Sequence, residues 1–550
     1  MPTAAEAVVK SLSDNGINYA YGIPAVHNLP LYDALYDSPS VRSVSVKHEQ
    51  AAGFMAIGSA YSSGKLAACF VGCGPGATNV LTPVAEAYLD SVPLIVIAGG
   101  IRTVSAGKGA LHDVDQVSLF KAVTKQASRL TDPKSLGVEV SKAIEVAANG
   151  RPRPVFLEIP FDVLSAQIEE ITTKVSRIAS STLNNDSMSS ILKILEQSSK
   201  PLIIAGGGVN SAQAWNELSK LAELLHSPVA STISAKGAFP ETNPLSLGQI
   251  WSEVASKAAS QADVVLSLGC RFSERSTTNW RLHFNGSLIQ VDIDQNELGR
   301  NYPYSVGVLS DVKLFLQELL ARLHKQNTVE RDAWIGTLNQ EKMLSEKKNE
   351  KYDSLSAKQV RPQTLIREIQ RAISEDTIVV AETGYAFWWS ALLLKIDKPR
   401  SYLAPSGNST LGFGFPAAMG AKCAKPDRPV ICLAGDGGFT FSCQELATAI
   451  EEKISVVTVI FDDSGYAAIR DFQRKGYGGR LIGVDFQNQL NFVKMAESLG
   501  AEGILVTKED EVYGAVKNSI QSSKTVIIDV KIGRDEDVLP SFFTQIYRKS

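Results

Sequence analysis

The sequence predicts an α/β protein with three doubly wound domains, each built around a parallel β-sheet. Three observations carry this prediction. The chain of 550 residues is too long for one hydrophobic core. Strand-length apolar runs alternate with helical patterns along most of it, which favours parallel sheets covered on both faces. Two polar stretches, residues 166–190 and 326–358, interrupt this alternation and are expected to be linkers.

The first expected domain covers residues 1–165. It opens with an amphipathic helix that Gly16 closes, and its strands deliver short motifs at their carboxyl ends. An Ala- and Gly-rich segment indicates a helix packed closely against the sheet. The expected elements are, in order, a helix over 3–16, strands over 18–21 and 42–46, the Ala-rich helix over 51–61, a strand over 66–71 and a closing strand near 153–160.

The central domain is expected over residues 190–325. Its first strand begins at residue 200 and ends in Gly206-Gly207-Gly208. Three glycines after a strand invite a dinucleotide-binding interpretation, but they lack the G-x-G-x-x-G spacing and favour a tight strand–helix turn. Further strands over 262–269 and 288–294 and a helix over 314–323 complete the pattern.

The third domain, residues 360–535, carries the stretch around which the chain is organised. A buried strand over 429–434 ends at Gly435-Asp436-Gly437-Gly438, and a second strand over 454–461 ends at Asp462-Asp463. Glycines let the backbone approach a bound group, and the N–H groups of the following helix favour an anion such as a diphosphate. A carboxylate there needs a cation, so Asp436 is expected to bind Mg²⁺. Adjacent parallel strands would bring Asp436 and Asp463 to one edge of the sheet.

Composition excludes several classes of protein. A formal net charge of −3 gives no basic face, so no nucleic-acid partner is expected. The six cysteines form no zinc-binding set and are expected to be reduced thiols in a cytoplasmic protein. No signal peptide is recognised, and the apolar runs are too short to cross a membrane.

Taken together, the motifs resemble the thiamine-diphosphate (ThDP) enzymes of the acetolactate synthase type, across nearly the whole chain. One segment also resembles the 2-hydroxyacyl-CoA lyase branch. The resemblance implies a pyrimidine-binding domain, a central domain and a diphosphate-binding domain, in that order. The segments that carry it are His48-Glu49-Gln50-Ala51-Ala52, Gly74-Pro75-Gly76-Ala77-Thr78-Asn79, the Gly435-Asp436-Gly437 and Asp462-Asp463 motifs, residues 237–240, 244–248 and 268–272, and residues 109–116 for the lyase branch.

The resemblance implies that Glu49 is the catalytic carboxyl group. It would hydrogen-bond N1′ of the aminopyrimidine, so that the cofactor can remove its own C2 proton. A Glu at the end of a strand, taken alone, would more often be a surface group. The further cofactor contacts implied are Pro24, Gly76, Asn79, Thr383, Gly384, Tyr385, Thr410, Leu411, Gly435, Asp436, Gly437, Gly438, Asp463 and Tyr466.

Some of these positions depart from the family pattern. Leu411 would wedge between the two cofactor rings, where relatives more often carry Met. Tyr385-Ala386 stands where acetolactate synthases usually have Gln and His. The metal ligands implied are Asp436, Asp463 and the backbone carbonyl of Gly465, and many relatives have Asn in place of Asp463.

Three residues are expected to face the substrate. His27 lies where lyase-like relatives carry a catalytic His, and its near-neutral pKa would suit proton relay; the alternative is a loop His bonded to backbone. His112 lies where acetolactate synthases have Gln. Phe472 stands near the position where acetolactate synthases have Trp. His48 is expected to be structural despite its place beside Glu49.

A second cofactor is left open. Acetolactate synthases bind a non-redox FAD through the central domain, and Arg151, Arg271 and the strand end at 291–294 fit that pattern. Against it, Gln249-Ile-Trp251-Ser252 stands where FAD-binding relatives have Gly-Met-His-Gly.

The sequence therefore predicts a ThDP- and Mg²⁺-dependent enzyme that forms or cleaves C–C bonds of 2-oxo acids, acetolactate synthase-like in type. One alternative is a C–C lyase similar to 2-hydroxyacyl-CoA lyase or benzaldehyde lyase, or a 2-oxo acid decarboxylase. Another is a catalytically silent ThDP-binding regulatory protein. In the family the site lies between the Glu49 domain of one subunit and the Asp436 domain of another, so a homodimer or homotetramer is expected.

Overall fold

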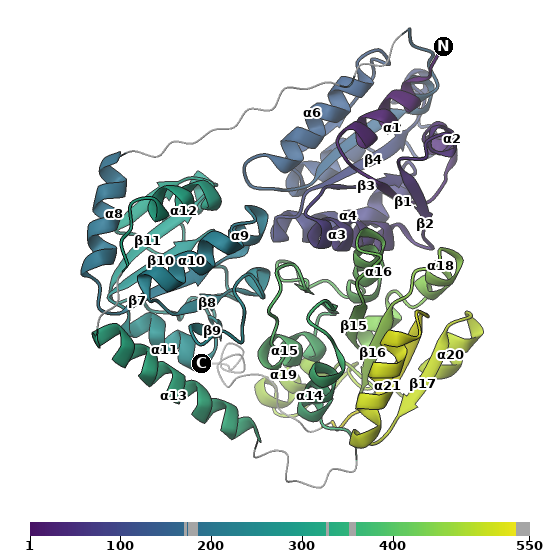
Figure 1. Cartoon of the computed structure of the whole chain (residues 1–550). Coiled ribbons are helices and arrows are strands. Elements are labelled where there is room, and N and C mark those ends of the chain that lie inside the picture. The colour runs from purple at the N-terminus through teal and green to yellow at the C-terminus, as the bar shows by residue number, and fades with distance from the viewer. Residues whose placement is uncertain (170–172, 174–184, 326–328, 351–358, 535–550) are drawn as a thin grey trace.

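The computed structural model describes residues 1–169, 173, 185–325, 329–350 and 359–534. These residues form three domains, each with a six-stranded parallel sheet between helices. In Figure 1 the N-terminal domain (purple) and the C-terminal domain (green to yellow) lie one above the other, and the central domain (teal) lies beside both. The predicted fold class is confirmed.

The sheet of the N-terminal domain has the strand order β2-β1-β3-β4-β6-β5. Its middle strands are apolar and buried on both faces, as expected of a parallel sheet covered by two helical layers. The strands are β1 Tyr19–Gly22, β2 Arg42–Ser45, β3 Ala67–Val71, β4 Leu94–Gly100, β5 Gln126–Arg129 and β6 Val155–Pro160. The helices are α1 Ala4–Asp14, α2 Leu29–Tyr36, α3 Glu49–Ser63, α4 Pro75–Asp90, α5 Gln116–Phe120, α6 Leu136–Ala148 and α7 Phe161–Leu164, with a 3-10 turn, η1, over Val26–Asn28.

The C-terminal domain repeats this topology, with the order β14-β13-β15-β16-β18-β17. The two domains are thus alike in strand order as well as in the alternation that the sequence shows. The strands are β13 Ile378–Ala381, β14 Tyr402–Leu403, β15 Val430–Gly435, β16 Val457–Asp462, β17 Glu502–Val506 and β18 Val526–Lys531. The helices are α14 Pro362–Ala372, α15 Tyr385–Leu393, α16 Gly414–Ala424, α17 Asp436–Thr440, α18 Glu445–Glu451, α19 Ala467–Gly476, α20 Phe492–Ser498 and α21 Glu509–Gln521.

The N- and C-terminal domains meet where α3 crosses α16 (Figure 1). Glycines let the two backbones approach closely at this crossing. A Cβ on Gly58 would lie 1.9 Å from the carbonyl oxygen of Ala417, and a Cβ on Gly420 would lie 1.9 Å from that of Met55. The Ala/Gly-rich segment therefore packs against a second domain as well as against its own sheet, and one apolar core runs through both domains.

The central domain has the order β12-β11-β10-β7-β8-β9. Numbered within the domain this is 6-5-4-1-2-3, the doubly wound order of dinucleotide-binding folds, whose switch point lies between the first and fourth strands, here β7 and β10. The strands are β7 Pro201–Ala205, β8 Val229–Ser231, β9 Ser246–Gln249, β10 Val264–Leu268, β11 Ser287–Asp292 and β12 Val306–Leu309. The helices are α8 Asn185–Gln197, α9 Gly207–Ser211, α10 Trp215–Leu225, α11 Glu253–Gln261 and α12 Val312–Leu320.

Both linker predictions need correction. Helix α8 begins at residue 185, inside the stretch 166–190, and helix α13 spans Val329–Glu350, inside the stretch 326–358. Most residues of α13 are polar or charged, so its few buried side chains are hard to recognise in the sequence. Trp334 and Leu338 join the core, and the buried guanidinium of Arg331 donates to carbonyl oxygens at the ends of α8 and α10. The remainder of both stretches lies outside the described residues, apart from residues 166–169 and 173.

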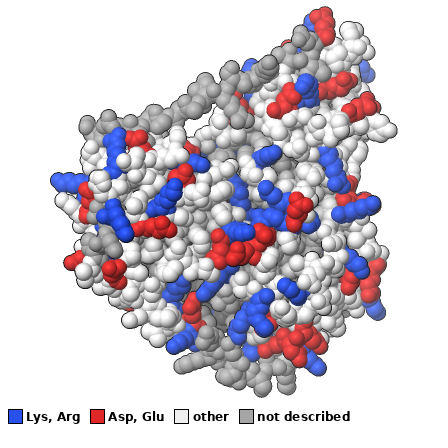
Figure 2. Space-filling model, viewed as in Figure 1, with Lys and Arg blue, Asp and Glu red and all other residues white. Residues whose placement is uncertain are grey.

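Acidic and basic side chains are interspersed on the face shown in Figure 2. This mixture agrees with the near-neutral charge of the chain. Within the described ranges, no helix is both long and apolar enough to cross a membrane.

Candidate active site

Glu49 lies in the first turn of α3, at the carboxyl edge of the N-terminal sheet. Its Oε2 accepts a hydrogen bond from Nδ2 of Asn79 at 2.9 Å. A Cβ on Gly76 would lie 3.3 Å from its Oε1, so Gly76 keeps this carboxylate accessible. The structure thus brings together three predicted residues from two motifs. His48 caps α3 through Nδ1, which accepts from the N–H of Gln50 at 3.1 Å, as its expected structural role requires.

His27 and His112 lie side by side near this carboxylate. Their ring centroids are 5.6 Å apart, and the Cβ of His112 is 3.0 Å from the position of a Cβ on Gly74, at the start of α4. His112 has φ 68°, and its buried Nδ1 has no hydrogen-bond partner in the part of the chain that the structure describes. Partial burial and the neighbouring His112 lower the pKa of His27. Pro24 is exposed in the loop that leads to His27.

Asp436 and Asp463 stand at the ends of β15 and β16, the adjacent strands that the sequence predicts. Oδ2 of Asp436 accepts from the N–H of Gly465 at 2.9 Å, and Oδ1 accepts from the N–H of Gly437 at 2.6 Å. Burial, then the charges of Asp463 and Asp462, raises the pKa of Asp436 to about 8. Such a buried acidic site favours a bound cation.

The donor set fits Mg²⁺ held partly by a diphosphate. No group of three or more His, Cys, Asp or Glu side chains gathers to bind a metal in the described parts of the chain. The two carboxylates and the carbonyl of Gly465 are oxygen ligands of the kind that Mg²⁺ prefers, and Mg²⁺ commonly takes its remaining ligands from water and phosphate.

The glycines of the motif have two different surroundings. A Cβ on Gly435 would meet nothing within 4 Å, which leaves this side open for a bound group. A Cβ on Gly437 would lie 2.5 Å from the ring of Tyr466, and one on Gly438 would lie 2.5 Å from Cγ of Glu382. Two of the expected cofactor glycines are therefore also required by the packing of the protein itself.

Glu382 holds two cofactor loops together. This fully buried side chain accepts from the N–H of Thr383 at 2.9 Å and from that of Gly414 at 2.7 Å. Burial raises its pKa to about 7. The hydroxyl groups of Thr383 and Ser409 are 2.7 Å apart, which joins the same two loops a second time. Gly384 has φ 106°, so this turn needs glycine.

The loop before α16 is fixed by carboxylates from the N-terminal domain. Buried Glu86 accepts from the N–H groups of Asn408 and Thr410 at 3.0 and 3.1 Å, and Asp90 accepts from the N–H of Ser406 at 3.0 Å. Leu411 follows this loop and is only half-buried, unlike a core leucine, so its side chain remains available to a ligand.

Tyr385 contacts helix α19 at Asp471, the residue before Phe472. The hydroxyl of Tyr385 donates to Asp471 of α19, next to Phe472, which is half-buried. The unusual Tyr385 thus ties the loop after β13 to the helix that follows Asp463.

Sequence reasoning missed Glu86, Asp90, Glu382 and Arg470. Glu86 and Asp90 lie i, i+4 on a helix and look like surface residues, because their partners are more than 300 positions away. Arg470 binds Asp463 and Asp485, and no motif marks it.

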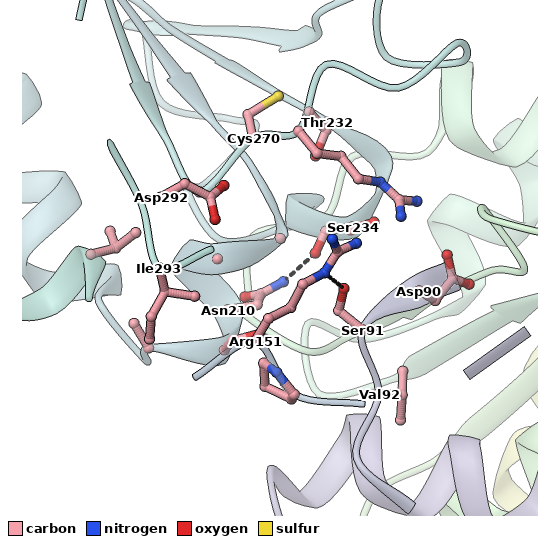
Figure 3. A pocket seen from close by; sticks show the side chains of 18 of the residues that line it. Asp90, Ser91, Val92, Arg151, Asn210, Thr232, Ser234, Cys270, Asp292 and Ile293 are labelled. Atoms are coloured by element: carbon pink, nitrogen blue, oxygen red, sulfur yellow. Dashed lines mark hydrogen bonds between the residues drawn. The ribbon is translucent and has the colours of Figure 1, made fainter. Parts of the chain in front are cut away.

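A cavity of about 440 Å³ lies at the switch point of the central domain, against the N-terminal domain (Figure 3). Gly207 and Gly208 line it after β7, and Arg271 lines it after β10. Arg151 enters from the N-terminal domain, with Nε donating to Ser91 at 2.8 Å and Nη1 paired with Glu297 at 2.5 Å. Trp251 also lines the cavity. The two predicted arginines, Arg151 and Arg271, therefore share one cavity.

Family models match all three domains. The thiamine pyrophosphate enzyme N-terminal TPP binding domain matches residues 2–119, the central domain matches residues 188–319, and the C-terminal TPP binding domain matches residues 382–530.

Curated relatives match over nearly the whole chain. A probable acetolactate synthase large subunit of Methanocaldococcus jannaschii is 36% identical over 96% of this chain and 91% of the relative. The acetolactate synthase large subunit of Corynebacterium glutamicum is 33% identical over 98% and 88%. The isozyme 3 large subunit of Escherichia coli is 30% identical over 98% and 96%. The chain therefore belongs to the thiamine-diphosphate-dependent enzymes, in their acetolactate-synthase-like group, as its motifs predict.

Proposed function

We propose that this chain is a carboligase that, with ThDP and Mg²⁺, converts two molecules of the 2-oxo acid pyruvate, one as donor and one as acceptor, into acetolactate and CO₂. The observation that carries the proposal is the Glu49–Asn79–Gly76 constellation at the edge of one sheet, matched by Asp436 and Asp463 at the edge of another. The product is inferred from the names of the relatives, which cover almost the whole chain.

The side chains have separable roles in this proposal. When bound, ThDP supplies a nucleophilic carbon that attacks the carbonyl of the donor. Glu49 would hold the proton at N1′ of the pyrimidine, with Asn79 orienting the carboxyl group. Asp436, Asp463 and the carbonyl of Gly465 would hold Mg²⁺ on the diphosphate. The remaining contacts proposed are Pro24, Thr383, Gly384, Tyr385, Thr410, Leu411, Gly435, Gly437, Gly438 and Tyr466.

A lyase is the second candidate function, and the His27–His112 pair favours it. Two imidazoles in contact could exchange a proton with a substrate. Burial and the neighbouring His112 lower the pKa of His27, which favours the neutral ring that accepts a proton and can then pass it on. The same pair could instead bind the acceptor 2-oxo acid through hydrogen bonds.

One paired assay separates the two functions. The purified protein, with ThDP and Mg²⁺, is given pyruvate in one reaction and a 2-hydroxyacyl-CoA in the other. We expect acetolactate from pyruvate. Aldehyde release from the thioester without any acetolactate would overturn the carboligase proposal in favour of the lyase. ThDP binding with turnover of neither substrate class, nor of other 2-oxo acids, would support the silent alternative.

We also propose that the active site is completed by a second copy of the chain, in a homodimer or homotetramer. Apolar side chains are exposed around both halves of the candidate site. Val26 and Leu111, next to the two histidines, are 70% and 80% exposed, and Ile482, near Tyr466 and Asp485, is 82% exposed. Exposed apolar groups of this kind commonly mark contact surfaces.

The cavity at the switch point is proposed to bind a diphosphate-containing dinucleotide, with FAD as the candidate. The doubly wound strand order, the glycines after β7 and the arginines Arg151 and Arg271 support this assignment. Trp251 occupies part of the cavity wall, so a smaller adenine nucleotide is the alternative. A flavin absorbance spectrum of the purified protein, with mass spectrometry of the ligand released on denaturation, decides between them.

A cytoplasmic location completes the proposal. All six cysteines are free thiols, and five of them are buried, which fits a reducing compartment. Fractionation of the source cells, followed by immunodetection, tests this location.

A further inference from the structure

Arg470 is one of the most deeply buried charged residues of the chain, and it lies directly behind the metal-binding edge. It belongs to α19, and its side chain is 2% exposed. Nη1 donates to Oδ2 of Asp463, and Nε donates to Oδ1 of Asp485 at 2.8 Å. Nη2 is buried and has no hydrogen-bond partner among the described residues, and a Cβ on Gly465 would lie 2.3 Å from it. One guanidinium therefore touches the proposed metal ligand Asp463 and packs against a second one, Gly465.

The charges at this edge need balance. Asp436, Asp462 and Asp463 crowd one end of the sheet, and a diphosphate would add further negative charge. Lys531 neutralises Asp462 by an ion pair, which leaves Asp436 and Asp463 for the metal. Asp463 is nearly as buried as Arg470, at 4% exposed, so water screens this pair only weakly.

We propose that Arg470 is a charge-balancing positioning residue for the metal–diphosphate site. Its guanidinium offsets the carboxylate of Asp463, so that an acidic ligand can serve at a position where a neutral Asn would suffice. It holds Oδ2 of that carboxylate and leaves Oδ1 for the metal. The proposal rests on the assignment of Asp463 as a metal ligand, and its test keeps the two apart.

A purely structural ion pair would behave differently from a charge-balancing one. Removing either partner of a structural pair loosens the edge, so cation and anion binding would weaken together. Removing the charge of Arg470 while the edge stays folded leaves one uncompensated negative charge. Cation binding would then strengthen and diphosphate binding would weaken. The opposite signs are the signature of charge balance.

The test compares Arg470→Gln, Asp463→Asn and the double variant with the wild-type protein. Binding of Mn²⁺ alone is measured by electron paramagnetic resonance, and binding of ThDP at saturating Mg²⁺ is measured by calorimetry. Arg470→Lys keeps the positive charge but lacks the two-pronged guanidinium. It therefore separates the effect of losing the charge from the effect of a damaged fold. Arg534→Gln is the matched control. Nε of Arg534 donates to the backbone carbonyl of Asp463 at 2.8 Å, but the Arg534 side chain is 46% exposed.

For Arg470→Gln we expect ThDP affinity to fall about tenfold to a hundredfold, the size of one extra charge several ångströms away in a partly screened site, while Mn²⁺ affinity rises. Asp463→Asn should weaken Mn²⁺ binding, and the double variant should return both affinities to within about threefold of wild type. Arg470→Lys and Arg534→Gln should each change them less than about threefold.

Two results would contradict the ligand assignment of Asp463 and the charge-balancing role of Arg470 separately. If Asp463→Asn and Asp463→Ala leave Mn²⁺ and ThDP binding unchanged, the ligand assignment of Asp463 fails. If Asp463→Asn weakens Mn²⁺ binding but Arg470→Gln weakens both affinities, or changes neither, Arg470 has no charge-balancing role.

Discussion

Glu49 occupies the first turn of α3, where its carboxylate meets Asn79 and lies beside Gly76. The position of Glu49 was predictable from the family resemblance, because its partners sit in a short motif about thirty residues away.

Glu49→Gln should keep ThDP binding and lose turnover. An amide of the same shape can still contact the pyrimidine but cannot exchange the proton, and general acid–base groups contribute about 10²–10⁴-fold to rate. Calorimetric titration of ThDP and a steady-state assay measure the two effects. Glu139→Gln, at a half-buried position in the same domain that pairs with Lys142, is the control. Equal loss of binding and rate would show that Glu49 only builds the pocket.

Glu382 predicts a specific pH dependence of stability. Its pKa is raised from 4.5 to about 7 because the side chain is fully buried. The folded protein therefore holds a proton that the unfolded chain releases, so the free energy of unfolding falls as pH rises from about 4.5 to 7 and stays low above it. The contribution is on the order of 3 kcal/mol.

Thermal unfolding of the ligand-free wild type and of Glu382→Gln at pH 5 and pH 8 checks this dependence. The wild type should lose stability relative to the variant as pH rises, because Gln has no proton to release. A difference between the two proteins that stays constant across the pH range would contradict the assignment.

Residues that no local motif marks could not be predicted. Glu86 binds loop residues more than 300 positions away, Glu382 binds Gly414, 32 positions away, and the partners of Arg470 lie 7 and 15 positions away. The motif around Asp436 was predictable because local spacing specifies a strand, a turn and a helix start, whereas Glu49 and Asn79 were predictable only from the family resemblance. The two glycines at 437 and 438 were also found, although the structure adds a packing reason for them.

At the scale of elements, the crossing of α3 and α16 joins the N-terminal and C-terminal domains of one chain. Gly420→Ala should destabilise the protein by about 1–3 kcal/mol or more, because the added methyl would lie 1.9 Å from the backbone oxygen of Met55. Gly336→Ala, in the exposed part of α13 with nothing within 4 Å of the new methyl, should instead be neutral or stabilise by about 0.5–1 kcal/mol. Denaturant unfolding measures both; equal effects would show that the crossing is not tightly packed.

Most elements followed from hydrophobic patterning, and the exceptions have a physical cause. The sequence predicts a linker where helix α13 lies, because only a few of its side chains are buried and most of its residues are polar or charged. The strand order of the central domain was also beyond the sequence, since alternation indicates a parallel sheet without ordering its strands. That order supplies the main structural support for a dinucleotide cavity.

At the scale of the whole molecule, two sheets with the same strand order carry the two proposed halves of a cofactor site. Glu49 stands at the edge of the first sheet and Asp436 at the edge of the second, nearly four hundred positions later. Two-fold assembly would give each site one sheet edge from each subunit. The proposed dimer is thus a consequence of how the site is divided along the chain.

Co-expression of two inactive variants tests this division most directly. Glu49→Gln and Asp436→Ala chains carry different tags, and the mixed species is purified through both. If each site combines Glu49 of one subunit with Asp436 of another, one of the two sites is intact, and about half of the wild-type activity should return. A pairing of Glu49→Gln with Asn79→Ala, both in the N-terminal domain, should stay inactive. A mixed Glu49→Gln and Asp436→Ala species as inactive as its parents, in an otherwise folded dimer, would contradict the account.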